Sequence, residues 1–200
     1  LEENKLSGII GIGEKKIENM KRALKMFDGN KRLLFNDALE IGNEILDEIK
    51  KIPFVQKAEL TGSLRRKKET IGDIDIVILA EPANRKKIVR RFIELPQVGK
   101  VLAQGTTRAS VLLKKDNVQV DIRLVHDYEY GAAMLYFTGS KEHNIKLRTI
   151  AKGRGFKLNE YGIFDIASGK RLAGKSEEEI YRFLNLPYIP PEKRLGKDEI

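Results

Sequence analysis

The stretch from Asp73 to Ala80 constrains the fold more than any other part of the chain, because it reads Asp-Ile-Asp-Ile-Val-Ile-Leu-Ala. An alternation with period two is typical of a β-strand with one buried face, so we expect its isoleucines to face a core. Asp73 and Asp75 then lie on the opposite face, with Cα atoms about 6.6 Å apart. Adjacent carboxylates repel each other, and a divalent cation between them removes that repulsion. The alternative is a solvated strand face without a ligand, which is the commoner meaning of an isolated Asp-x-Asp pair.

Two further features support the cation interpretation. Gly62-Ser63 lies ten residues before Asp73 and follows a strand-like stretch, so its turn can offer N–H groups and a hydroxyl to a phosphate. Asp121 lies on a later strand candidate, between Val120 and Ile122. If that strand pairs with the first one, three carboxylates converge, and such oxygen ligands suit Mg²⁺ or Mn²⁺. Two ions at this point would clamp the oxygens of a phosphoryl transfer.

Apolar spacing and turn residues divide the chain into three blocks, at residues 1–53, 54–126 and 127–200. The expected helices are 14–27, 36–51 with Asn36 as N-cap, 84–93, 128–136, 141–153 and 176–184. The expected strands are 55–60, 73–80, 109–115, 118–125, 156–166 and 170–172. Helices and strands in this order predict an α+β fold.

Composition narrows the functional classes. The 38 basic and 29 acidic residues give a net charge of +9, which suits a nucleic-acid partner, although a lysine-rich proteome would produce the same balance. Cysteine is absent, which excludes disulfides and cysteine-based metal sites or nucleophiles. No apolar run reaches 18 residues and no charged-then-apolar segment typical of a secretory signal stands at the N-terminus of the sequence, so we expect no membrane partner and a cytoplasmic location in a prokaryote.

The third block carries the most specific motif. Tyr136-Phe137-Thr138-Gly139-Ser140, then Lys141 to Asn144, Arg148 and Gly155 to Gly162, closely resembles the nucleotide-receiving region of family X DNA polymerases. Thr61 to Asp73 also resembles that family, especially its bacterial and archaeal members, and the resemblance covers nearly all 200 residues. The Gly-Ser and aspartate motifs alone are shared by the whole nucleotidyltransferase superfamily, so they indicate the chemistry better than the substrate.

The resemblance implies an architecture. Residues 1–53 would be the C-terminal part of the fingers with a helix-hairpin-helix remnant, 54–126 a nucleotidyltransferase palm with a small mixed or antiparallel sheet, and 127–200 an α+β thumb. It also implies the catalytic and metal-binding set, which is Asp73, Asp75 and Asp121 with two Mg²⁺ or Mn²⁺ ions. The residues implied to bind the dNTP are Gly62, Ser63, Arg66, Arg32, Tyr136, Phe137, Gly139 and Asn144, with Arg32 the weakest match. Those implied to bind DNA are Gly11, Gly13, Lys15, Arg123, Arg148 and Tyr161.

The activity implied by the resemblance is DNA-directed DNA polymerisation, in which a dNTP is added to a primer 3′-hydroxyl on gapped or primer-template DNA during repair, including base excision repair. Two alternatives stay open: a nucleotidyltransferase with a different acceptor, and a truncated DNA-binding module without catalysis. Read singly, Tyr136 and Phe137 can be core aromatics, Gly139-Ser140 can be helix caps, and His143 is expected to be incidental.

The ends of the sequence carry one further expectation. The chain starts at Leu1 rather than Met and ends at Ile200, shortly after Pro187, Pro190 and Pro191. We therefore expect a piece of a longer polymerase, without the lyase and phosphoesterase domains that many members of the family carry.

Overall fold

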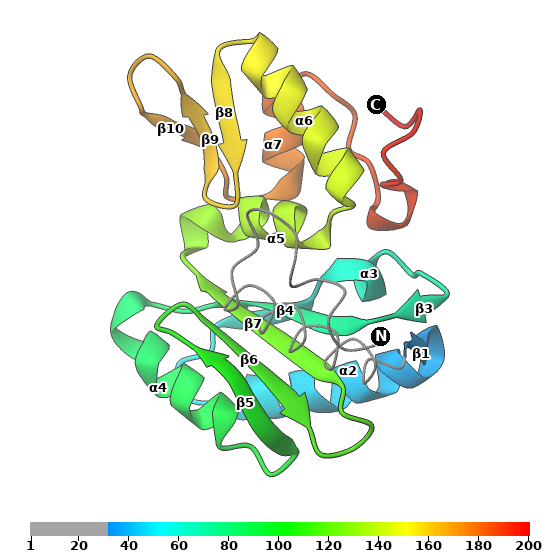
Figure 1. Cartoon of the computed structure of the whole chain (residues 1–200). Coiled ribbons are helices and arrows are strands. Elements are labelled where there is room, and N and C mark those ends of the chain that lie inside the picture. The colour runs from blue at the N-terminus through cyan, green and yellow to red at the C-terminus, as the bar shows by residue number, and fades with distance from the viewer. Residues whose placement is uncertain (1–31) are drawn as a thin grey trace, which may run out of the picture. The chain divides into compact units, whose positions relative to one another are not determined.

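The alternating stretch forms β4 (Asp73–Leu79), the second strand of a five-stranded sheet with the order β2-β4-β7-β6-β5 (Figure 1). The computed structural model describes residues 32–200, which form one unit. Within the sheet, β4 pairs in parallel with β7 and antiparallel with β2, and the remaining pairs are antiparallel. The other strands of this mixed sheet are β2 (Lys57–Leu60), β5 (Val98–Gln104), β6 (Arg108–Leu113) and β7 (Gln119–Val125).

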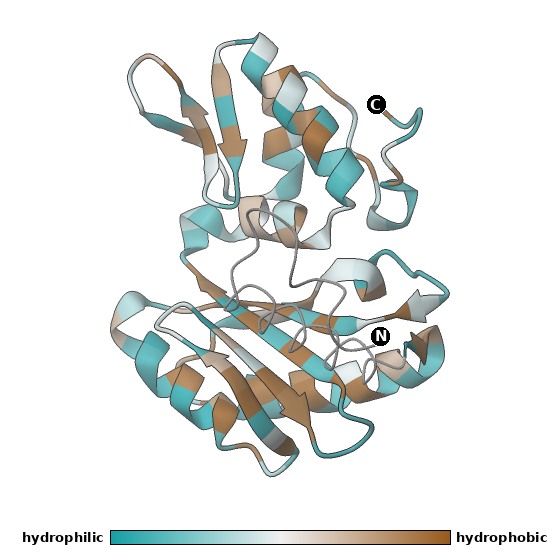
Figure 2. Ribbon diagram, viewed as in Figure 1, coloured by the Kyte–Doolittle hydropathy of each residue, from teal (hydrophilic) through white to brown (hydrophobic). Residues whose placement is uncertain are grey.

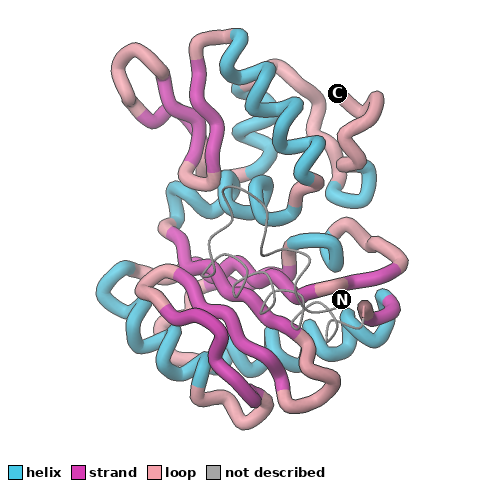
Figure 3. The backbone as a smooth tube through the Cα atoms, in the orientation of Figure 1, coloured by secondary structure: helices cyan, strands magenta, loops and turns pink. Residues whose placement is uncertain are grey.

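Two helices, α2 (Phe35–Lys51) and α4 (Pro82–Ile93), cover one face of this sheet (Figure 3). The expected isoleucine face lies there, because Ile74 and Ile78 are fully buried in the same core as Ile45 of α2 and Ile88 of α4. Figure 2 shows brown, apolar segments along the strands of this sheet and on both helices. The opposite face of β4 therefore carries the aspartates.

A second layer begins after β7. The 3₁₀ turn η1 (Asp127–Glu129) leads into α5 (Tyr130–Thr138), which packs with Ala133 and Met134 on Val77 of β4 and Val125 of β7. A small antiparallel sheet of order β10-β9-β8 then packs with α6 and α7 around its own core. Its elements are α6 (Lys141–Gly153), β8 (Phe156–Asn159), β9 (Gly162–Asp165), β10 (Arg171–Ala173), α7 (Glu177–Phe183) and η2 (Pro191–Lys193).

The α+β fold class is confirmed, and several local expectations need correction. The strand expected at 156–166 is a hairpin of two strands, β8 and β9, and β5 was not expected at all. Asn36 is not an N-cap, because α2 begins one residue earlier with Leu34 at the cap position. The boundaries at 53 and 126 stay predictions, although α2 shares its core with the five-stranded sheet.

Some expectations cannot be compared with the structure. The helix expected at 14–27 and the hairpin residues Gly11, Gly13 and Lys15 lie outside the described residues. Within residues 32–200, no helix is both long and apolar enough to cross a membrane.

Candidate active site

Three carboxylates meet on one face of the five-stranded sheet, on the inner strands β4 and β7. Asp75 of β4 and Asp121 of β7 are direct neighbours in the parallel register, and Asp73 lies two residues before Asp75 on the same face. Each of the three offers an oxygen, and these oxygens lie within 4.8 Å of one another. The expected convergence is therefore present, and its cause is the pairing of β4 with β7.

Electrostatics make this cluster unfavourable without a cation. Burial, followed by the charges of Asp73 and Asp121, raises the pKa of Asp75 to about 7. Burial and the charge of Asp121 also raise the pKa of Asp73 above its usual range. Because both shifts come from desolvation and mutual repulsion, the ionised cluster gains most from a bound divalent ion. The donor set is all oxygen, which fits Mg²⁺ or Mn²⁺.

The Gly62-Ser63 turn lies directly against this cluster. Gly62 begins the short helix α3 (Gly62–Arg65), and its φ of +61° belongs to the left-handed region. A Cβ at this position would lie 2.2 Å from Oδ2 of Asp75, so only glycine lets the turn approach the carboxylate. The first turn of a helix leaves backbone N–H groups without intrahelical partners, and such groups can bind an anion beside the carboxylates.

Most of the residues expected to bind the nucleotide line one open pocket of about 340 Å³ beside the carboxylates. The lining residues are Gly62, Ser63, Arg66, Asp73, Asp75, Tyr136, Phe137, Gly139, Lys141, Asn144 and Arg148. The pocket thus joins two carboxylates, the Gly62-Ser63 turn and a pair of aromatic rings. Lys141 was not expected from the sequence and adds a cation to the same wall.

Two side-chain hydrogen bonds, from α6 and from the C-cap of α3, hold the last turn of α5 beside this pocket. Arg66 donates a hydrogen bond to the carbonyl of Thr138, and Asn144 Nδ2 donates to the carbonyl of Tyr136 at 2.7 Å. Tyr136 and Phe137 contact each other edge to face, with ring centroids 5.1 Å apart. Gly139 caps α5 and Ser140 caps α6, as the structural explanation expects, and Gly139 also lines the pocket.

Among the described residues expected to bind the nucleotide or DNA, three do not line that pocket. Arg32 donates from Nε to Thr70 Oγ1 at 2.9 Å, and its guanidinium also bonds the Thr70 carbonyl. Arg123 lies with its guanidinium carbon 4.9 Å from the centre of the Phe137 ring, in a neighbouring pocket that Asp121 also lines. Tyr161 is 49% exposed at the turn between β8 and β9. Their expected contacts with nucleotide or DNA stay predictions.

A further contact with Asp121 was missed because it depends on strand pairing. Gln119 Nε2 donates to Asp121 Oδ2 at 2.9 Å and approaches Ser110 Oγ, on the neighbouring strand, at 3.3 Å. The two residues are two positions apart on β7 and therefore share a face, which is the only sequence signal for this contact. Gln119 fixes the orientation of the third carboxylate.

A buried ion-pair network connects α3 to the C-terminal layer. Glu177 at the start of α7 bonds Arg65 Nη2 at 2.6 Å and Arg194 Nη1 at 2.6 Å, and Arg65 also donates to Thr138 Oγ1 at 2.7 Å. The side chain of Arg194 is fully buried. We call Arg65, Glu177 and Arg194 the clasp, because they join α3 to α5 and α7.

The expectation that His143 is incidental is wrong. His143 is fully buried in the first turn of α6, with Nε2 2.7 Å from the hydroxyl of Tyr181 and Nδ1 2.9 Å from Glu199. Burial holds the pKa of His143 below its usual range. The residue therefore packs the C-terminal tail against α6, a structural role that its sequence context did not indicate.

Comparisons with known proteins agree with this geometry. The DNA polymerase beta thumb family matches residues 133–195. The chain is 37% identical over 202 residues to the DNA polymerase/3′-5′ exonuclease PolX of Bacillus subtilis, covering 100% of this chain and 35% of that protein. It is 31% identical over 137 residues to repair DNA polymerase X of African swine fever virus, covering 67% of this chain and 79% of the viral protein.

Comparison with solved structures shows that the fold is also shared. The polymerase beta of Leishmania infantum, in a ternary P/T complex, superposes with a TM-score of 0.75 at 24% identity, covering 95% of this chain and 85% of that one. The identity to the viral polymerase extends over most of that protein's length, and the same chain places Asp73, Asp75, the Gly-Ser turn and the aromatic pair around one pocket, with Asp121 beside Asp75. The chain therefore belongs to the family X DNA polymerases.

Proposed function

We propose that this chain is the core of a DNA-directed DNA polymerase that adds a dNTP to a primer 3′-hydroxyl on gapped or primer-template DNA in repair. The observation that carries the proposal is the pocket lined by Asp73, Asp75, the Gly62-Ser63 turn and the Tyr136-Phe137 pair, next to which Asp121 completes the carboxylate cluster. The chain spans about a third of the length of its Bacillus subtilis relative, 35%, and the proposal concerns this part alone.

Each group in the pocket has a chemical role in this proposal. Asp73, Asp75 and Asp121 would hold two Mg²⁺ or Mn²⁺ ions, which supply Lewis-acid activation and charge neutralisation when bound. The N–H groups and hydroxyl at Gly62-Ser63, with Arg66, bind the triphosphate oxygens. The 3′-hydroxyl oxygen forms a bond to the α-phosphorus, the bond to pyrophosphate breaks, and Asp121 is placed to accept the hydroxyl proton.

The aromatic pair and the thumb helix would receive the nucleoside. Tyr136 and Phe137 would lie against the sugar, and Asn144 would hydrogen-bond the sugar or the base edge. Arg148 and Tyr161 face the template strand, and Arg123 and Arg32 add positive charge near the DNA and the triphosphate. In this arrangement residues 54–126 act as palm and 127–200 as thumb, while 1–53 form the C-terminal part of the fingers, with Gly11, Gly13 and Lys15 on the DNA backbone.

Primer extension on a one-nucleotide-gapped duplex tests the proposal. With Mg²⁺ or Mn²⁺ and each dNTP supplied separately, we expect extension by the template-matched nucleotide alone, and its loss in Asp73→Ala. Salt-dependent DNA binding without any extension would favour a DNA-binding module instead. Addition that ignores the template would favour a nucleotidyltransferase with another acceptor.

Tyr136 gives a prediction about sugar selection. Its side chain is 36% exposed at the pocket, where a 2′-hydroxyl would meet the ring. In Tyr136→Ala we expect the ratio of kcat/KM for the ribonucleotide to that for the deoxynucleotide to rise about tenfold, because loss of a steric clash of about 1.4 kcal/mol has that effect. Steady-state single-nucleotide extension with matched dNTP and rNTP measures the ratio. An unchanged ratio would mean that Tyr136 contributes to packing and not to sugar selection.

Gln119 gives a prediction about the orientation of Asp121. Gln119→Leu keeps the size of the side chain but removes the donor to Asp121 Oδ2. Since partners of metal ligands typically contribute about 10–100-fold to metal affinity or activity, we expect weaker Mn²⁺ binding, by about tenfold, in the absence of DNA and nucleotide. Electron paramagnetic resonance measures free Mn²⁺, and Gln104→Leu on the exposed edge strand β5 is the control. Equal Mn²⁺ affinity in wild type and Gln119→Leu would mean that Gln119 does not orient Asp121 for metal binding.

A further inference from the structure

A second basic pocket lies on the helical side of the five-stranded sheet. It has a volume of about 420 Å³, and its lining residues are Ile52, Pro53, Phe54, Lys87, Arg90, Arg91 and Glu94. We call it the α4 groove, because four of these residues belong to α4 or its C-cap. It shares no residue with the pockets that the carboxylates line, and α4 covers the sheet face opposite the aspartates.

Phe54 is held in this groove in an unfavourable conformation. Its φ is +75°, a region that bulky residues rarely adopt and that costs about 1–3 kcal/mol. Its ring is nevertheless 52% exposed, so little burial compensates for the strain. The segment after α2 thus presents an aromatic face to solvent at the wall of the groove, beside Lys87, whose Nζ lies 5.2 Å from the ring centre.

The charge of the groove is positive and only partly neutralised. Arg90 Nε bonds Glu94 at 2.9 Å. Within residues 32–200, neither Lys87 nor Arg91 takes part in an ion pair, although both line the groove. Two cations next to an exposed ring therefore face the same cavity.

This combination fits a particular ligand chemistry. Cations in a groove bind a phosphate backbone, and an exposed aromatic ring stacks on an unpaired base. Paired bases in a duplex are already stacked and do not offer a face to a side chain. The apolar floor of Ile52 and Pro53, and a volume well above that of one phosphate, favour a nucleotide unit over a free anion.

We propose that the α4 groove binds single-stranded DNA, with a base stacked on Phe54 and flanking phosphates on Lys87 and Arg91. The site is separate from the carboxylate pocket. The inference therefore does not depend on the proposed polymerase activity. For a chain that acts on gapped DNA, it would provide a second point of attachment for an unpaired strand outside the cleft where nucleotides are added.

The sequence contains no tryptophan, which provides a local probe. Phe54→Trp introduces the only tryptophan, so its fluorescence reports on the groove alone even if DNA also binds elsewhere. We expect quenching on titration with a ten-nucleotide oligo(dT), and little quenching with a blunt hairpin of equal phosphate number or with inorganic phosphate. Absence of quenching by oligo(dT), or equal quenching by the hairpin or by phosphate, would overturn the proposal.

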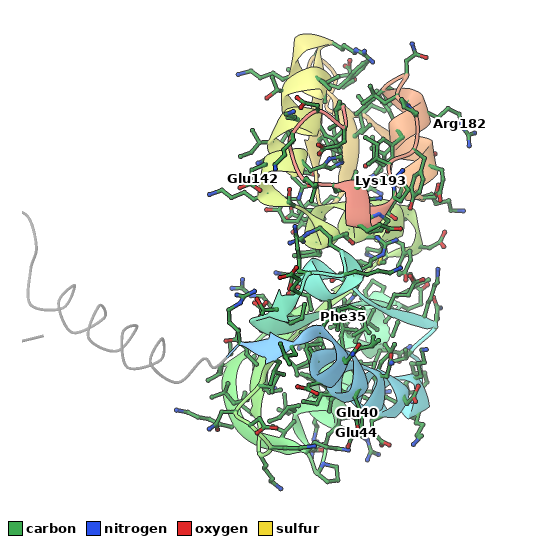
Figure 4. All side chains as sticks on the ribbon, turned by 90° about the vertical axis from the view of Figure 1, so that its right-hand side faces the viewer. Phe35, Glu40, Glu44, Glu142, Arg182 and Lys193 are labelled. Carbon is green, nitrogen blue, oxygen red and sulfur yellow. The ribbon has the colours of Figure 1, made fainter. Side chains whose placement is uncertain are left out.

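Matched variants separate the groove from general charge. In the Phe54→Trp background, Lys87→Ala with Arg91→Ala should weaken the oligo(dT) affinity about tenfold. The slope of log affinity against log salt should fall by about 1.4, because each phosphate that a side chain neutralises on a single strand contributes about 0.7 to that slope. Arg182→Ala removes a like charge from α7, where the side chain points outward from the helix (Figure 4), and should change neither. If Arg182→Ala weakened the oligo(dT) affinity as much per removed charge as the double variant does, only the net charge would matter. Circular dichroism melting checks that each variant is folded.

Discussion

Asp121→Asn is expected to lower the rate of nucleotide addition by at least about 10³-fold, because the carboxylate that would hold the metal and accept the proton in the proposed reaction loses its charge. Asp121 is the register partner of Asp75, and its carboxylate oxygen is within 4.8 Å of ligand atoms on both other aspartates. Asparagine keeps the shape and the hydrogen-bond acceptor but removes the charge. Single-turnover extension of a gapped duplex with saturating dNTP measures the chemical step.

The same substitution should not destabilise the fold. The charge of Asp121 helps to raise the pKa of both Asp73 and Asp75, which means that the ionised cluster works against folding when no metal is bound. We therefore expect an unchanged or higher melting temperature for Asp121→Asn in metal-free buffer. Addition of Mn²⁺ should raise the melting temperature of the wild type and raise that of the variant less.

Asp116→Asn is the matched control for charge. Asp116 lies in the turn between β6 and β7 with φ +58°, a conformation that asparagine tolerates well. Its loss should leave both the extension rate and the response to Mn²⁺ unchanged. Normal extension by Asp121→Asn would mean that the charge of Asp121 is not needed for catalysis. Loss of extension together with a lower metal-free melting temperature would point to a folding defect instead.

The parts of this site that the sequence predicts are those set by local pattern. The two-residue period from Asp73 to Ala80 places both aspartates on one face without any knowledge of the neighbouring strands. Gly62 before Ser63 similarly predicts a turn, and the structure adds that glycine is required by the approach of Asp75. The helices were found because their buried stripes are regular, as in α6, which spans 141–153 as expected.

The missed features depend on contacts between distant segments. Strand β5 is an edge strand with mostly exposed residues and two register irregularities, so it lacks the alternation that identifies β4. Gln119 looks like any polar residue on a strand until β7 is paired with β6 and β4. Arg194 follows a proline-rich segment, where a charged residue is normally solvated, yet it is fully buried through contacts with Glu177 and the Ile189 carbonyl.

Glu177→Gln is expected to cost about 3–5 kcal/mol of folding free energy, because it leaves two largely buried arginines without their counter-charge. The side chain of Glu177 is 7% exposed and lies between Arg65, 21% exposed, and Arg194, 0% exposed. Glutamine keeps the shape of the side chain, so the loss reports on charge rather than on packing. For a domain of this size the melting temperature should fall by roughly 10 °C.

The pH dependence of stability should also differ between the wild type and Glu177→Gln. Burial alone would raise the pKa of Glu177, but hydrogen bonds and charge from Arg65 and Arg194 hold that pKa below its usual value. A depressed carboxylate pKa contributes stability above the unfolded-state pKa and loses it as pH falls through the folded-state pKa. The wild type should therefore lose more stability than Glu177→Gln between neutral pH and the acidic range below pH 4.5, the ordinary value for this group.

Urea unfolding at several pH values measures both effects, and Glu178→Gln is the control. Glu178 is the next residue of α7 but is exposed, so its loss removes the same charge without touching the clasp. We expect that change to alter stability by less than about 0.5 kcal/mol. If Glu177→Gln were as stable as Glu178→Gln, the clasp would contribute no net energy. If it were destabilised equally at all pH values, the cost would lie in packing rather than in the charge of Glu177.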